Sequence, residues 1–123
     1  MKRDMDLIRQ ILIDAESRNF ENGEPHELFK ASTPDEAYQI ALMKDNGLVE
    51  GDVTTTNLIP SEATIYRLTW AGHDFLDAAR NDTIWKKAKD TFLKPGVSWT
   101  FSLLVEWLKQ EAHNKVFGIP KGS

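Results

Sequence analysis

The fold is decided by residues 33–80, which read TPDEAYQIALMKDNGLVEGDVTTTNLIPSEATIYRLTWAGHDFLDAAR. Thr33 is placed to cap a helix, with Pro34 at the first helical position and Glu36 at the capping-box spacing. We expect this helix to stop at Gly47, because glycine takes the left-handed conformation that closes a helix. The stretch therefore begins with a helix that is marked at both ends.

Two strands follow that helix. Residues 48–53 and 64–69 are rich in β-branched and apolar side chains, which suit an antiparallel pair. The connection between them, about residues 54–63, is longer than a tight hairpin turn and includes Pro60. The order helix, strand, open loop and strand is typical of a winged helix-turn-helix domain, in which the loop is the wing and the preceding helix presents side chains to a ligand.

Helices are expected on both sides of this stretch. Residues 4–18 carry an apolar stripe at helical spacing, which is Met5, Ile8, Ile11, Leu12 and Ala15, with Asp4 as the cap. A short extended piece is expected at residues 25–31. A further helix is predicted from residue 69 or 70 to residue 79, and two more at residues 83–94 (capped by Asn81-Asp82) and 98–116 (capped by Ser98).

These elements predict a mainly α protein with a small β-hairpin (α+β), namely a winged helix-turn-helix with extra carboxy-terminal helices. The length of 123 residues suits one domain. We expect that domain to cover residues 1–118, and residues 119–123 to form a flexible tail.

The composition of the chain excludes several classes of function. The chain has no cysteine, which excludes disulfides, thiolate zinc sites and cysteine nucleophiles. The amino terminus lacks the apolar core of a signal peptide, and no apolar run approaches the roughly 18 residues that span a membrane. We therefore expect a cytoplasmic protein without membrane contact. The formal net charge is −4, so any affinity for nucleic acid depends on where the cations gather.

The presenting helix is poor in cations. Ile40, Met43 and Leu48 are expected in the core, which leaves the other residues of the helix for its outer faces. Readout of a DNA groove needs Arg, Lys, Asn or Gln, whereas the wing region holds Glu50, Asp52 and Glu62. The candidate residues for contact with a partner protein or DNA are Tyr38, Gln39, Leu42, Lys44 and Arg67.

The most distinctive local motif is the segment WAGHDFLDAAR at residues 70–80. His73 and Asp77 are four residues apart and share a helix face, but a zinc ion needs three or four ligands and no third is placed by the sequence. The motif is better interpreted as a local structural network, with Asp74 or Asp77 holding Arg80 and His73 bonding a backbone group. Trp70 opens this motif.

The later helices offer two further surfaces. Lys86, Lys87, Lys89 and Lys94 form the one basic patch with several cations, which is either a solvated face or a contact for phosphate or an acidic partner. The last helix, within residues 98–116, is broadly apolar and must cover a core or meet a partner. A homodimer through residues 98–116 is therefore one expectation.

No catalytic set emerges from the sequence. His26, His73 and His113 are scattered, and neither a Gly-rich phosphate loop nor a serine elbow is present. We expect no enzymatic activity, no metal and no cofactor.

Four stretches resemble a known family: MKRDMDLIR at residues 1–9, GLV at 47–49, LTWxGHDFLDxxR at 68–80, and Trp85. They are similar to a family of small bacterial and prophage proteins of unknown function. The resemblance covers nearly the whole chain and implies a winged-helix fold and phage or mobile-element biology. It supplies no catalytic residues. Winged-helix regulators usually keep two helices ahead of the hairpin, and here the second is replaced by the short piece at residues 25–31 or is very reduced.

Two functions follow from these observations. The first is a protein-interaction module, such as a phage-encoded modulator of a host or defence factor, because the presenting helix and wing are poor in cations. The alternative is a DNA-binding transcriptional regulator that uses Gln39, Lys44 and Arg67 with the basic patch. A third idea, a metal-dependent hydrolase at His73, has the weakest basis.

Overall fold

The computed structural model describes residues 2–18 and 27–117, and the side chains of all of these except 115–117. The expected tail at 119–123, and residues 25–26 of the expected extended piece, lie outside the described residues. The chain divides into two compact units, Met1–Leu76 and Asp77–Ser123, which we call the hairpin unit and the helical unit.

The described residues form five helices and one three-stranded antiparallel sheet with the strand order β1-β3-β2. The predicted α+β class is confirmed. The elements are α1 (Met5–Ser17), β1 (Phe29–Lys30), α2 (Pro34–Asp45), β2 (Val49–Thr56), β3 (Ile59–Leu68), α3 (Trp70–Ala79), α4 (Asp82–Thr91) and α5 (Phe101–Phe117).

Both helices before the hairpin begin where their capping residues predict. The Asp4 side chain accepts a hydrogen bond from the Leu7 amide, and the predicted stripe of α1 is buried. The Thr33 hydroxyl accepts from the Glu36 amide at 3.1 Å. The Glu36 carboxylate reaches back to the amide of Ser32 at 2.7 Å, one residue beyond the usual capping-box partner.

The end of α2 sets the direction of the hairpin. Gly47 has a φ of +73°, its amide donates to the Lys44 carbonyl, and the Leu48 amide donates to the Met43 carbonyl. These two bonds form a Schellman motif. Leu48 and Met43 are both buried, which supplies the apolar contact of that motif. The chain therefore enters β2 from a fixed angle.

The hairpin differs from the prediction. An open loop over residues 54–63 was expected, but β2 and β3 continue to a two-residue turn at Asn57 and Leu58. Both residues have positive φ, 53° and 68°, as in a type I′ turn. The prediction was wrong because the β-branched run at residues 54–56 extends β2, and because Pro60 is accommodated beside a register shift.

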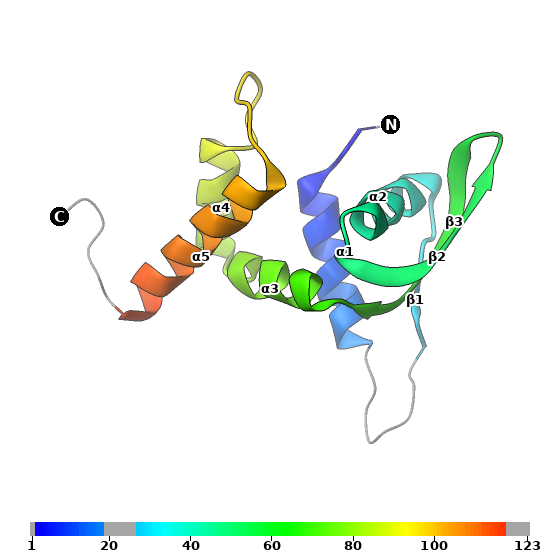
Figure 1. The fold of residues 1–123 in the computed structure, drawn as a ribbon, viewed down its shortest axis with the longest axis horizontal. Coiled ribbons are helices and arrows are strands. Elements are labelled where there is room, and N and C mark those ends of the chain that lie inside the picture. The colour runs from blue at the N-terminus through cyan, green and yellow to red at the C-terminus, as the bar shows by residue number, and fades with distance from the viewer. Residues whose placement is uncertain (1, 19–26, 118–123) are drawn as a thin grey trace. The chain divides into compact units, whose positions relative to one another are not determined.

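The sheet and two helices enclose the core of the hairpin unit. α2 packs against β2 and β3, and α1 packs against α2 and β3, as Figure 1 shows. β1 pairs with β3, with Phe29 opposite Ile65. Only residues 31–33 connect β1 to α2, so no second helix lies directly ahead of α2. Figure 1 also shows the turn of the hairpin extending past the amino-terminal end of α2.

The Leu68-Thr-Trp-x-Gly motif joins the hairpin to α3. The Thr69 hydroxyl accepts from the Gly72 amide at 3.1 Å and donates to the Gly47 carbonyl at 2.5 Å. A Cβ on Gly72 would fall on the carbonyl oxygen of Leu48. The motif is therefore a helix cap and a close backbone contact, both of which fix α3 against the turn after α2.

The helical unit is built from α4 and α5 with the end of α3. Its buried apolar side chains include Ile84, Trp85, Ala88, Leu104 and Leu108. The rings of Phe92 and Trp107 meet edge to face at 5.4 Å between centroids. No helix in the described part of the chain is long and apolar enough to cross a membrane.

Two boundaries of the helical unit differ from the prediction. α4 ends at Thr91 rather than at Lys94, because the turn before Pro95-Gly96 begins earlier. α5 begins at Phe101, and its cap is Thr100, whose hydroxyl accepts from the Leu103 amide at 3.1 Å. Ser98 is therefore not the capping residue.

Candidate partner-binding surface

The candidate surface begins with the outer faces of α2, where two predictions are corrected. Ala37 was expected on an outer face and is fully buried. Gln39 was expected to face outward, but its side chain is fully buried. Its carboxamide accepts from the Asp4 amide at 2.9 Å and donates to the Lys2 carbonyl at 2.8 Å. The prediction for Gln39 was wrong because glutamine is usually exposed, whereas the side chain of Gln39 forms hydrogen bonds with the backbone ahead of α1. Gln39 cannot read a base or a partner.

Three of the predicted contact residues of α2 remain accessible. Tyr38 and Leu42 are half-buried, and Lys44 is exposed. Lys44 is the one Lys or Arg in the sequence of α2. The accessible side of this helix therefore has mixed aromatic, aliphatic and polar character with a single cation.

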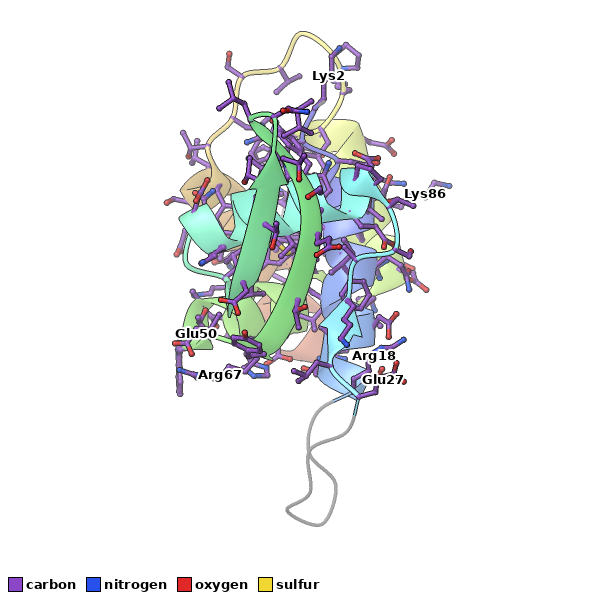
Figure 2. All side chains as sticks on the ribbon, turned by 90° about the vertical axis from the view of Figure 1, so that its right-hand side faces the viewer. Lys2, Arg18, Glu27, Glu50, Arg67 and Lys86 are labelled. Carbon is purple, nitrogen blue, oxygen red and sulfur yellow. The ribbon has the colours of Figure 1, made fainter. Side chains whose placement is uncertain are left out.

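Arg67 is the one Lys or Arg of β2 and β3, and it is held by a carboxylate. Its Nε and Nη2 donate to the two carboxylate oxygens of Glu50, at 2.8 Å and 2.7 Å. The two residues lie opposite each other across the strands, and Figure 2 shows them together at the lower left. Both are more than half exposed, so the pair is open to solvent and stabilises the fold little.

A β-bulge places a tyrosine beside this pair. The register shifts between Glu50 and Gly51, so that Arg67 faces Glu50 while Ile65 faces Gly51. Tyr66 lies in the bulge and is 45% exposed. Its hydroxyl donates to the Asp52 carboxylate, and this hydrogen bond is the main cause of a raised pKa of Tyr66.

Trp70 gives this end of the hairpin a large exposed aromatic ring. It is the first residue of α3 and is 88% exposed, although it was assigned to a structural motif from the sequence. Exposed Trp, Tyr and Arg side chains are the residue types that dominate protein interfaces. We define the hairpin-base surface as Glu50, Asp52, Tyr66, Arg67 and Trp70.

Sequence reasoning identified only part of that surface. Arg67 was a candidate, but Tyr66 was missed. Strict alternation along β3 would place either Tyr66 or Arg67 inward, and only the bulge turns both outward. Gly51 was the available signal, because a Cβ there would fall on the Thr64 carbonyl oxygen and glycine in a strand often marks a bulge.

The tip of the hairpin is apolar. Leu58 is 95% exposed and Ile59 is 52% exposed. Residues 53–62 contain no Lys or Arg, and Glu62 is exposed. A wing that contacts phosphates needs cations, so this tip is better suited to an apolar contact.

The segment at residues 70–80 forms one local ion pair and one contact with α1. The guanidinium of Arg80 lies 3.1 Å from the Asp77 carboxylate, which confirms one of the two expected pairings. His73 Nδ1 lies 3.4 Å from the Glu16 carboxylate on α1, whereas a backbone partner was expected. No group of three His, Cys, Asp or Glu that could hold a metal ion occurs among the described residues.

The basic patch is split by the end of α4. Lys86 and Lys87 are exposed on α4, and Lys94 is exposed beyond its end, while Lys89 is half-buried. The Lys87 ammonium lies 3.3 Å from the carboxylate of Glu111 on α5. The four lysines therefore do not form one continuous helix face.

The apolar side of α5 is partly covered within its own unit. Leu104 and Leu108 are buried, whereas Leu103 is 56% exposed. Trp99 and Trp107 are half-buried. A homodimer through residues 98–116 stays a prediction.

The two units have opposite charge. Residues 1–76 contain seven Lys or Arg against fourteen Asp or Glu, a net charge of −7, and residues 77–123 contain eight against five, a net charge of +3. The hairpin unit, which carries the predicted reading surface, is the acidic one.

Comparison with known proteins places the chain in a family. Residues 2–98 match the family described as "Hypothetical protein (DUF2513)". The chain is also 35% identical over 115 residues to an uncharacterized protein of Haemophilus influenzae (strain ATCC 51907 / DSM 11121 / KW20 / Rd), an alignment that covers 91% of this chain and 92% of that protein. The chain belongs to the DUF2513 family, whose function is unknown. No solved structure matches the chain significantly.

Proposed function

We propose that this chain is a non-enzymatic, cytoplasmic binding module of winged-helix type that acts by contacting another protein through the hairpin-base surface. The observation that carries the proposal is the pairing of Arg67 with Glu50 next to the exposed Tyr66, with the exposed ring of Trp70 only three residues beyond Arg67 in the chain. A phosphate backbone would meet carboxylates at this surface, while a protein would meet aromatic anchors with a charged rim.

The order of the sheet supports the winged-helix relationship. α2 packs on a sheet with the order β1-β3-β2, and the β2–β3 hairpin directly follows α2. The departure is the three-residue connection between β1 and α2, which leaves out the helix that normally precedes the presenting helix. Loss of that partner helix favours a module that uses its hairpin rather than a groove-reading helix pair.

A DNA-binding regulator is the second candidate. It is favoured by the net charge of +3 of the helical unit, by Lys44 and by the exposed lysines of α4. Against it stand the burial of Gln39 and the net charge of −7 of the hairpin unit. We also propose phage or mobile-element biology, with a host or defence factor as the partner, on the basis of the sequence resemblance alone.

Replacement of Trp70 tests the protein-binding proposal. Trp70→Ala removes an 88% exposed ring, so the fold should keep its stability while proteins captured by the wild-type chain from a bacterial lysate are lost. With a captured partner in hand, the affinity should fall about tenfold or more. Leu103→Ala is the matched control, because Leu103 is an exposed apolar residue of the other unit. Loss with Leu103→Ala and retention with Trp70→Ala would move the partner site to α5 and contradict the proposal.

A DNA-binding measurement separates the two candidates. Fluorescence anisotropy with duplex DNA, at about 50 mM and about 200 mM salt, should show weak binding at both concentrations. Tight binding that falls steeply with salt, and that weakens in Lys44→Ala and Arg67→Ala, would favour the regulator instead.

A further inference from the structure

We infer that β2 receives an extended segment of the partner protein as a fourth strand, and that this segment carries Lys or Arg at alternate positions. The inference rests on the proposed function and names the chemistry of the partner. It depends on three features of the hairpin unit: the position of β2 in the sheet, the residues of β2, and the charge beside its exposed face.

β2 lies at the edge of the sheet. The strand order β1-β3-β2 places β3 on one side of it, and no described strand pairs with its other side. The strand is eight residues long, enough for several hydrogen bonds to an added strand. The opposite edge is formed by β1, which has two residues and offers little backbone to a partner.

The sequence of β2 lacks two of the common guards of an edge strand, which are lysine and proline. Proteins often guard exposed edges with lysine or proline, and the sequence VEGDVTTT contains neither. Its last four residues are Val53, Thr54, Thr55 and Thr56, which are β-branched and uncharged. Such residues favour extended backbone and strand pairing.

The negative charge on the exposed face of β2 determines which kind of partner strand can pair with it. Glu50 and Asp52 are two residues apart on β2 and both are exposed, and Glu62 lies opposite Thr54 on β3. Arg67 contacts only Glu50 of these three. Side chains of an added strand would lie beside Glu50 and Asp52, where opposite charges stabilise a cross-strand pair and like charges destabilise it. The partner strand should therefore bear Lys or Arg at every second residue.

A second copy of the chain is a poorer occupant. It would bring the same carboxylates to the same edge, from a unit whose net charge is −7. Repulsion between the two hairpin units disfavours edge-to-edge pairing of identical chains. The observations therefore favour a basic segment of a different protein.

Selection from a displayed library of random eight-residue peptides tests the charge rule. The wild-type chain should enrich peptides with Lys or Arg at alternate positions and β-branched residues between them. The double variant Glu50→Gln/Asp52→Asn should bind the enriched peptides about three- to tenfold more weakly, the effect expected for exposed charge pairs. The control variant is Glu27→Gln/Asp45→Asn, which removes two exposed carboxylates outside β2, and it should bind them within about twofold of wild type. Figure 2 shows Glu27 toward the opposite edge of the sheet from Glu50.

Backbone N-methylation tests the strand geometry. In an added strand, alternate amides point toward β2 and the others point to solvent. Two versions of one selected peptide, methylated on the odd or on the even amides, should therefore differ. One should lose binding by about tenfold or more, and the other should bind nearly as the parent does. Equal effects of the two patterns, enrichment without basic residues, or the absence of any enriched peptide would overturn the inference.

The proposed function and this inference fail in different ways. If a partner is captured in a Trp70-dependent manner but binds the Glu50→Gln/Asp52→Asn variant as well as wild type, then the hairpin-base surface is used and β2 is not. If the chain instead binds duplex DNA tightly, the proposed function itself fails.

Discussion

At the scale of single residues, Gln39 shows how one side chain can serve the fold while resembling a functional group. It lies on the presenting helix, where glutamine suits base recognition, yet its amide joins α2 to the backbone of residues 2 and 4. The placement of Gln39 is a property of the packed unit, because two of its three hydrogen-bond partners lie 35 or more positions away in sequence.

Replacement of Gln39 should therefore destabilise the protein. Gln39→Ala removes three side-chain hydrogen bonds and leaves a cavity, and we expect a loss of about 2–4 kcal/mol of unfolding free energy. Chemical denaturation measures the change. Lys44→Ala on the same helix is the control, since Lys44 is exposed and should change stability by less than about 0.5 kcal/mol. A neutral Gln39→Ala would contradict the buried network.

Tyr66 provides a pH-dependent signal for the hairpin-base surface. The hydrogen bond to Asp52 raises the pKa of Tyr66 above the ordinary tyrosine value of 10.0. Its contribution to stability is therefore fully present below pH 10, the value of the unfolded chain, and is lost as the pH rises through the higher folded pKa.

Asp52→Asn should lower the pKa of Tyr66 toward its ordinary value, because the charged acceptor is lost. Ultraviolet titration measures this, and Tyr66→Phe identifies the signal, since the chain has two tyrosines. An unchanged titration in Asp52→Asn would exclude the Tyr66–Asp52 contact.

At the scale of elements, two glycines near the end of α2 have different physical roles. Gly72 has no room for a Cβ, because the Leu48 carbonyl occupies that position, whereas Gly47 has open space but a φ of +73°. Gly72→Ala should cost more than about 3 kcal/mol, since backbone must move. Gly47→Ala should cost about 1 kcal/mol, the penalty of left-handed backbone for alanine. Thermal or chemical unfolding of the two variants decides this, and a larger loss for Gly47→Ala would refute the packing of α3 on Leu48.

The hairpin turn carries a leucine where glycine is preferred. Leu58 has a φ of 68° and is 95% exposed, so it contributes strain without burial. Leu58→Gly should stabilise the chain by about 1 kcal/mol, because Asn-Gly suits a type I′ turn. If the tip contacts the partner, the same variant should weaken capture of that partner. A less stable Leu58→Gly protein would argue against this turn.

At the scale of the whole molecule, charge divides the chain more sharply than its composition suggests. The net charge of −4 hides an acidic hairpin unit and a basic helical unit. Repulsion among fourteen carboxylates against seven cations in the hairpin unit should destabilise it at low salt.

Added sodium chloride should therefore raise the melting temperature by a few degrees, through screening of that repulsion. Glu62→Gln removes one of the exposed carboxylates and should make the melting temperature less sensitive to salt. A melting temperature that falls as salt is added would show that the ion pairs outweigh the repulsion.

The sequence by itself determined the positions and classes of most elements. Asp4, Thr33 and Asn81 begin their helices as predicted, because caps act through hydrogen bonds to residues only three positions away. The buried stripe of α1 and the turn at Gly47 could be predicted from the sequence for the same reason, since both depend on local geometry. The division into one domain over residues 1–118 stays a prediction.

Only the tertiary structure decided how the side chains of the candidate surface are arranged. The bulge that turns both Tyr66 and Arg67 outward, the pairing of Arg67 with Glu50 and the burial of Gln39 all join residues 14 or more positions apart. Their outcome depends on strand register and on what packs over α2, and no local pattern encodes either. From its lack of cations the sequence predicted a surface for protein interaction, and the structure adds a paired arginine, two exposed aromatic rings and a strand edge that no described strand pairs.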